Sequence, residues 1–93
     1  MNDDLAEARG ALERGNIGDA HRKAWDAAFA AENARDADAL DEIRSLALQI
    51  EERAEGSTRE EAHRLAVYCS ACSDDIRAGI PHDSTMSRLF RRR

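Results

Sequence analysis

Residues 36–55, DADALDEIRSLALQIEERAE, contain the strongest helical pattern in the chain. Apolar side chains recur there at intervals of three or four positions, which places them on one face of an α-helix. They are Leu40, Ile43, Leu46, Ala47, Ile50 and Ala54. Gly56 follows, and a glycine at this place is typical of the left-handed residue that ends a helix. Because one whole face of this helix is apolar, the pattern predicts neighbouring helices that cover it.

Composition favours helices over strands along the whole chain. Alanine, leucine, arginine and glutamate dominate its 93 residues, whereas valine and proline occur once each. This balance predicts an all-α protein. Eighteen of the apolar residues are alanine, so the core of this single domain contains few large side chains. We therefore expect helices that approach each other closely, or a core that a partner completes.

Three further helices are predicted around the central one. The first ends at about residue 14, and Gly10 within it indicates close approach by another helix. The second spans residues 19–34, where Trp25 and Phe29 accompany an alanine stripe and are expected to supply most of the buried area. The third spans residues 58–78, with a capping box at residues 57–60 (STRE) and a stop at Gly79. The apolar positions of the three are Leu5, Ala8, Ala11, Leu12, Ala20, Ala24, Ala27, Ala31, Ala62, Leu65, Ala66, Cys69, Cys72 and Ile76.

Four helices joined by short turns predict two antiparallel helix hairpins. The small residues of the first hairpin are Ala8, Ala11, Gly15, Ala20, Ala24 and Ala27. With these spacings, residues 5–34 resemble a tetratricopeptide repeat, and residues 38–72 are similar to a second copy. The resemblance implies packed helical hairpins and a role in protein–protein interaction. Because two repeats leave exposed apolar ends, the sequence leaves open a tetratricopeptide-like pair, a four-helix bundle, and a homodimer that covers such an end.

Cys69 and Cys72 form the one motif with chemical promise. Thiols three positions apart share a helix face, and His63 and His82 would complete the four ligands of a zinc site. The pair falls late in a regular helix, however, whereas redox cysteines usually lie at a helix amino terminus, where the dipole lowers the thiol pKa. We therefore interpret both as small buried residues and predict no metal or cofactor. A metal- or redox-responsive regulator is the alternative that this pair keeps open.

No arrangement of residues predicts an enzyme. Neighbouring carboxylates such as Asp74 and Asp75 point about 100° apart on a helix, so they do not converge on a substrate. A phosphate-binding loop and a nucleophile elbow are absent from the sequence. His21 and His63 have charged neighbours, and we expect both side chains at the surface rather than at a metal.

Residues 84–93 differ in charge from residues 1–83. The net charge is −5, and because the last ten residues carry four arginines and no acid, the first 83 carry −9. An acidic body disfavours nucleic-acid binding. The segment is a basic amphipathic tail, with apolar Met86, Leu89 and Phe90 followed by Arg91, Arg92 and Arg93. We interpret it first as a solvated, frayed end. The alternative is docking, for which an acidic protein surface of the same or another chain suits it better than a membrane.

These observations predict a non-catalytic protein–protein interaction module or small scaffold, with one helical domain over residues 1–83. The expected partner-binding residues are Trp25, Phe29, Leu89, Phe90, Arg91, Arg92 and Arg93. Exposed members of the group Leu40, Ile43 and Leu46 would extend this surface. Leu48 and Val67 fall outside the apolar stripes and indicate a second surface. A peripheral membrane or nucleic-acid binder acting through the arginines is a third class of function.

The cellular setting is inferred from the start of the chain and from its composition. The first residues, MNDD, are acidic and lack the apolar run of a signal peptide, and no segment has the length of a membrane span. We therefore expect a cytoplasmic protein with reduced thiols. Thirteen arginines against one lysine indicate a GC-rich bacterial genome.

Overall fold

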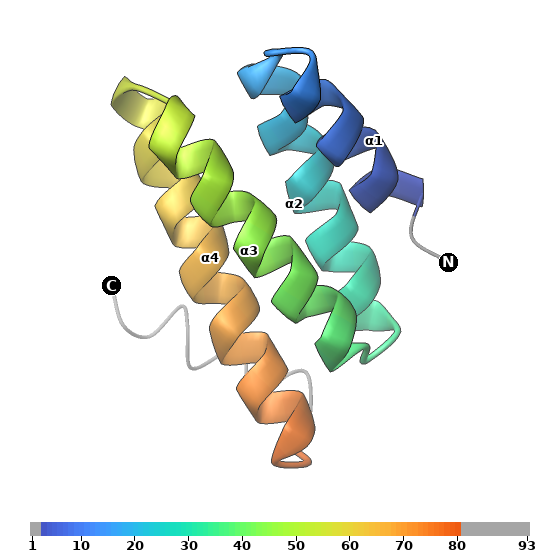
Figure 1. Ribbon diagram of the computed structural model, residues 1–93. Coiled ribbons are helices and arrows are strands. Elements are labelled where there is room, and N and C mark those ends of the chain that lie inside the picture. Colours follow the sequence, from blue (N-terminus) through green and yellow to red (C-terminus); the bar gives the residue numbers. More distant parts are fainter. Residues whose placement is uncertain (1–2, 81–93) are drawn as a thin grey trace.

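The structure, a computed structural model, describes residues 3–80, which form four α-helices and no strand (Figure 1). They are α1 (Asp3–Glu13), α2 (Ile17–Asn33), α3 (Ala37–Arg53) and α4 (Gly56–Arg77). The all-α prediction is confirmed. The helices pack as a compact bundle of two hairpins, α1/α2 and α3/α4.

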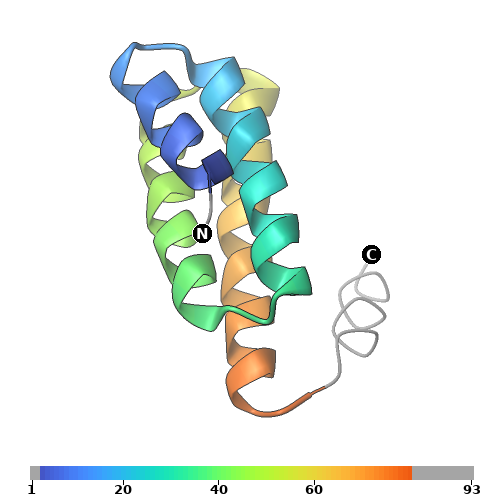
Figure 2. The same cartoon turned by 90° about the vertical axis from the view of Figure 1, so that its right-hand side faces the viewer.

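The four helices lie in two layers. In Figure 1, α1 and α3 form the front layer, with α2 and α4 behind them, and Figure 2 shows the pair of layers from the side. The Cα atoms extend over 37 × 32 × 15 Å. The short dimension equals about one interhelical spacing plus the width of a helix backbone. The closest packing is within each hairpin, and the contact of α2 with α3 joins the two hairpins, whereas α2 and α4 touch less extensively.

Three of the helices end in the same hydrogen-bonded turn. After α1, the N–H groups of Gly15 and Asn16 return to the carbonyls of Leu12 and Ala11, and Gly15 has φ of 80°. Residues 35–36 repeat these bonds after α2, and residues 79–80 repeat them after α4. This is the Schellman motif, in which a left-handed residue satisfies the last carbonyls of a helix. The predicted stop at Gly79, with φ of 77°, is confirmed.

The first turns of α2 and α3 are capped in the same way. The side chains of Asn16 and Asp36 accept hydrogen bonds from the N–H groups of Asp19 and Ala39, at 3.2 and 3.1 Å. Each cap satisfies one of the free donors at a helix start. Because Asn16 is the cap, α2 begins at Ile17, two residues before the predicted start.

The predicted capping box at the start of α4 is wrong. The helix begins at Gly56 after Glu55, whose extended backbone precedes it, and no side chain caps its first turn. Ser57 therefore lies inside the helix. Gly56 has the predicted left-handed φ, 61°. It does not end α3, because that helix has already ended at Arg53 and Ala54 is extended. Gly56 instead lies at the turn into α4.

The core consists of the predicted apolar stripes. Leu40, Ile43 and Ile50 of α3 and Leu65 of α4 are fully buried, and alanines fill the contacts of α1 and α2. Of the predicted positions, Ile76 is only partly buried. Gly10 does not mark a close approach by another helix, because a Cβ atom there would meet only the guanidinium of Arg14.

Two predictions about large apolar residues are wrong. Trp25 is only partly buried and Phe29 is 46% exposed, so neither supplies most of the buried area. Each follows a buried alanine, Ala24 or Ala28, by one position, which turns it about 100° away from the core. Conversely, the group Leu40, Ile43 and Leu46 is buried against other helices and offers no partner surface.

Candidate interaction surface

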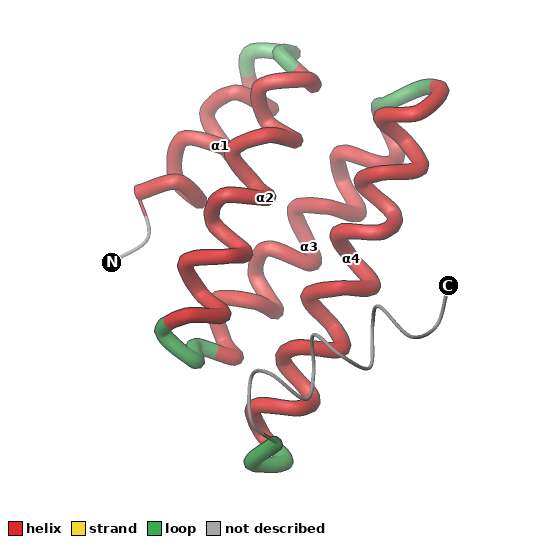
Figure 3. Tube along the Cα trace, turned by 180° about the vertical axis from the view of Figure 1, so that it is seen from behind, coloured by secondary structure: helices red, strands yellow, loops and turns green. Residues whose placement is uncertain are grey.

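Three aromatic rings from α2 and α4 gather in one place. Figure 3 shows the two helices that carry them from behind. Trp25 and Phe29 lie one turn apart on α2, with ring centroids separated by 5.6 Å. Tyr68 of α4 lies 5.6 Å from Trp25 and 6.0 Å from Phe29, in tilted and edge-to-face arrangements that aromatic rings favour. We call these three residues the aromatic patch. The structure therefore brings the two predicted anchors, Trp25 and Phe29, together with a third ring that the sequence had not indicated.

A buried carboxylate holds the third ring in place. Glu32 of α2 is only 5% exposed, and its Oε1 accepts a hydrogen bond of 2.7 Å from the hydroxyl of Tyr68. Its Oε2 accepts a second bond, 3.0 Å long, from the thiol of Cys72. Hydrogen bonds to an ionised acceptor are roughly twice as strong as neutral ones. This cluster fixes α4 against α2 and orients the phenol ring at the surface.

Sequence reasoning missed Glu32, although a signal was present. Glu32 follows the buried positions Ala24 and Ala28 at intervals of four, so it lies on the core face of α2. Tyr68 precedes Cys72 by four positions and shares its helix face in the same way. An acid in a core register needs donors, and these two residues supply them.

The environment of Cys69 and Cys72 favours inert thiols. Both side chains are buried, and both thiols are free. Burial raises the pKa of Cys69 to about 12. Burial, assisted by the hydrogen bond to Glu32, also raises the pKa of Cys72 well above its ordinary value. Since the thiolate is the nucleophile, the raised pKa values disfavour reactivity of both thiols at neutral pH.

The histidines of the proposed zinc set occupy unrelated places. His63 is exposed, as predicted, and its Nδ1 lies 3.3 Å from a carboxylate oxygen of Glu51. His82 lies outside the described residues. Within residues 3–80, no three histidines, cysteines or acids are grouped as metal ligands.

The prediction that His21 lies at the surface is wrong. Its side chain is 12% exposed and packs edge-on beside Trp25, at 6.4 Å between centroids. Its Nε2 lies 3.4 Å from a carboxylate oxygen of Glu61 on α4. The charged sequence neighbours of His21 point elsewhere because α4 approaches only one side of α2. His21 and Glu61 therefore border one end of the aromatic patch.

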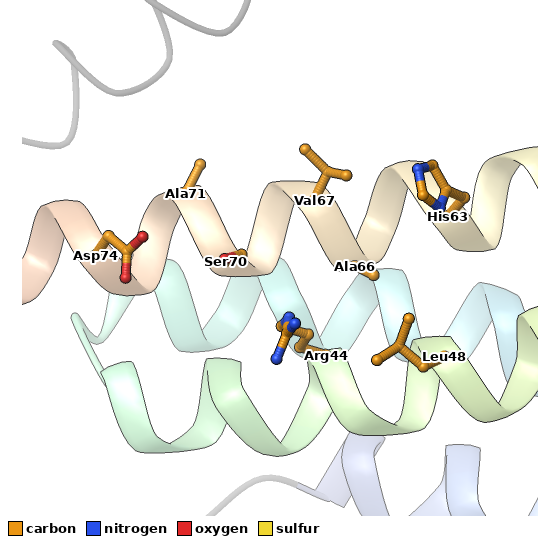
Figure 4. A pocket seen from close by; sticks show the side chains of 8 residues that line it. All are labelled: Arg44, Leu48, His63, Ala66, Val67, Ser70, Ala71 and Asp74. Carbon is orange, nitrogen blue, oxygen red and sulfur yellow. The ribbon is translucent and has the colours of Figure 1, made fainter.

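A second apolar surface lies between α3 and α4 (Figure 4). Leu48 is 39% exposed and Val67 is 50% exposed, and both line one open groove. Arg44, His63 and Asp74 supply polar groups along its sides. The structure therefore brings together the two residues that the sequence analysis placed outside the apolar stripes.

A polar network joins α3 to α4 near the end of the bundle. Arg77 lies 2.9 Å from Asp38 and 2.8 Å from Asp41, and it donates to the hydroxyl of Ser73. Ser73 in turn donates to Asp41 at 2.8 Å. The hydrogen bond from Arg77, together with that from Ser73, holds the pKa of Asp41 below its ordinary value. The carboxylates of Asp38 and Asp41 converge on the guanidinium of Arg77, and these contacts hold α3 against α4 within the second hairpin.

The predicted divergence of Asp74 and Asp75 is also observed. Asp74 is exposed in the groove between α3 and α4, whereas Asp75 is 4% exposed. The remaining predicted partner-binding residues, Leu89, Phe90, Arg91, Arg92 and Arg93, lie outside the described residues.

Comparison of the chain with protein families, curated proteins and solved structures gave no match. Among the described helices, none combines the length and apolarity needed to cross a membrane.

Proposed function

We propose that the protein is a non-catalytic interaction module that binds a protein partner through the aromatic patch. The observation that carries this proposal is the exposure of Phe29 within a cluster of three aromatic rings. Aromatic residues dominate the energetics of protein interfaces, whereas a folded domain gains little from leaving such rings in water. The tetratricopeptide-like succession of hairpins belongs to the same proposal, since that family binds proteins.

The rings of the patch are pre-organised for binding. Trp25 is partly buried against the core cluster, and the phenol of Tyr68 is hydrogen-bonded to the buried Glu32. A partner that covers these rings immobilises few additional torsions, which lowers the entropic cost of association. Phe29, which is half exposed, offers the largest apolar area for a partner to bury.

The chemistry at the patch supports binding rather than catalysis. Desolvation by burial, together with the hydrogen bond to Glu32, raises the pKa of Tyr68 above its ordinary value. The pKa of Cys72 is raised as well, so both groups are protonated at neutral pH. Neither is therefore activated as a nucleophile or a general base. The same argument counts against a thiol-based regulator.

The test compares two full-length variants that alter different apolar surfaces. Phe29→Ser removes the exposed ring of the patch, and Leu48→Ser removes a similarly exposed apolar side chain from the α3/α4 groove. Each chain is used to capture proteins from cells of the source organism, and a captured protein is then purified and titrated by calorimetry. We expect Phe29→Ser to weaken its affinity by about 30-fold, the effect of a 2 kcal/mol anchor, and Leu48→Ser to leave it unchanged. Equal affinities for the wild type and Phe29→Ser would refute the proposal.

A further inference from the structure

The described chain ends beside α2. Ile80 donates its N–H to the carbonyl of Asp75 at 2.8 Å, which turns the chain back after α4. Arg35, in the turn that follows α2, donates to the carbonyl of Ile80 at 2.8 Å. Ile80 therefore lies on the α2 side of α4. This is the side that carries the aromatic patch, whereas the Leu48/Val67 groove lies on the α3 side.

The remaining chain is long enough to reach the patch. Tyr68 precedes Arg77, the last residue of α4, by nine positions, which is about 14 Å along the helix axis. Leu89 and Phe90 follow Ile80 by nine and ten positions. Such a segment covers about 14 Å as a helix and about 30 Å when extended. Both apolar residues are therefore within reach of the rings of Tyr68 and Phe29.

The net charges of residues 84–93 and of the rest of the chain are opposite in sign. Residues 84–93 carry four arginines and no acid, against −9 for residues 1–83. Glu61, which is half exposed, borders the patch beside His21. Asp26 is exposed and lies one helical turn from Phe29 on the same side of α2. A segment with two adjacent apolar residues followed by arginines suits an aromatic patch with acids at its edges.

We propose that residues 84–93 bind the aromatic patch of the same chain. Leu89 and Phe90 cover the rings of Trp25, Phe29 and Tyr68, and the arginines lie near the acids at the edge. The segment then acts as an internal competitor, and an external partner of the same chemistry, a basic segment with apolar anchors, displaces it. The inference uses the surface of the proposed function, but the docking of the segment requires no external partner.

The sole tryptophan, Trp25, reports on this contact. The test variant is the full chain with Leu89→Ser and Phe90→Ser, and the matched control in the same segment carries Thr85→Ser and Ser87→Ala. Quenching of Trp25 fluorescence by acrylamide measures how accessible the ring is. We expect the quenching constant to rise by about twofold in the test variant, because the patch loses its cover, and to stay unchanged in the control. Equal constants for the wild type and the test variant would overturn the inference.

Two further measurements identify the occupant. A synthetic peptide of residues 84–93, added to the Leu89→Ser/Phe90→Ser chain, should restore the lower quenching in a saturable manner, and failure to do so would contradict the inference. Light scattering of the wild type should give the mass of one chain. A dimer that dissociates in the test variant would instead show that the segment binds a second copy, which overturns binding within one chain.

The outcomes separate this inference from the proposed function. If Trp25 is equally accessible in the wild type and the test variant, while Phe29→Ser still loses the captured partner, only the internal competitor is refuted. If the segment covers Trp25 but no partner depends on Phe29, the inference stands and the proposed function fails.

Discussion

Replacement of Tyr68 by phenylalanine tests whether the buried carboxylate of Glu32 holds the two hairpins together. The variant keeps the ring against Trp25 and Phe29 and removes only the hydroxyl that donates to Glu32 at 2.7 Å. A hydrogen bond to a charged group contributes about 1.5–3 kcal/mol, and its loss leaves part of a buried carboxylate without that donor. Because Tyr68 is only partly buried, we expect a loss of about 2 kcal/mol in the free energy of unfolding.

The assay is urea unfolding followed by Trp25 fluorescence and by helical circular dichroism. For a domain of this size a slope of about 1 kcal/mol per molar urea converts the loss into a fall of about 2 M in the midpoint. The melting temperature should fall by about 8–16 °C. Cys72→Ala alone and in combination with Tyr68→Phe provides a double-mutant cycle, and the two losses should not add, since both side chains donate to Glu32. A midpoint shift below about 0.3 M in Tyr68→Phe would refute the structural role assigned to this bond.

Three other predictions concern the core, the thiols and the ion-pair network. Ile43→Ala, at a fully buried position, should lower the free energy of unfolding, measured by thermal denaturation, by about 3 kcal/mol. A loss below about 1 kcal/mol would contradict the assigned core. Burial raises the pKa of Cys69 to about 12 in the folded protein. The stability that the protonated thiol contributes is therefore complete below pH 9 and declines between pH 9 and 12. The urea midpoints of the wild type and Cys69→Ala should converge or cross as pH rises, and parallel profiles would exclude this titration. Arg77→Ala should raise the pKa of Asp41, measured by NMR, and lower the urea midpoint only slightly at pH 7. This difference should disappear as pH falls through the acid range, and an unchanged pKa of Asp41 would remove Arg77 as its cause.

Periodicity was a reliable guide to the helices because it reflects burial of one face. Leu40, Ile43 and Ile50 were predicted on one stripe, and all three are fully buried. Local capping was less predictable, since several residues compete for the same role. Ser57 had the hydroxyl expected of a cap, but the left-handed Gly56 reverses the chain one residue earlier and places Ser57 inside α4.

The surface was predicted only in part. Trp25 and Phe29 were recognised as neighbours on one helix, and Leu48 and Val67 as residues outside the stripes. The exposure of all four depends on which flank of each helix receives a neighbour. Tyr68 joined the patch only because α4 returns beside α2, a contact between residues far apart in the sequence.

The all-α fold, the four helices, the alanine-rich core and the buried cysteines can be predicted from the sequence, because side-chain periodicity and helix propensity act over a few neighbouring residues. The hydrogen bonds of Glu32 with Tyr68 and Cys72, and the gathering of three aromatic rings on one surface, follow instead from how the helices pack in space. These features depend on the packing of α2 against α4, two helices that are separated along the sequence by α3. Long-range contacts of this kind arise from the arrangement of whole helices, which no local pattern encodes.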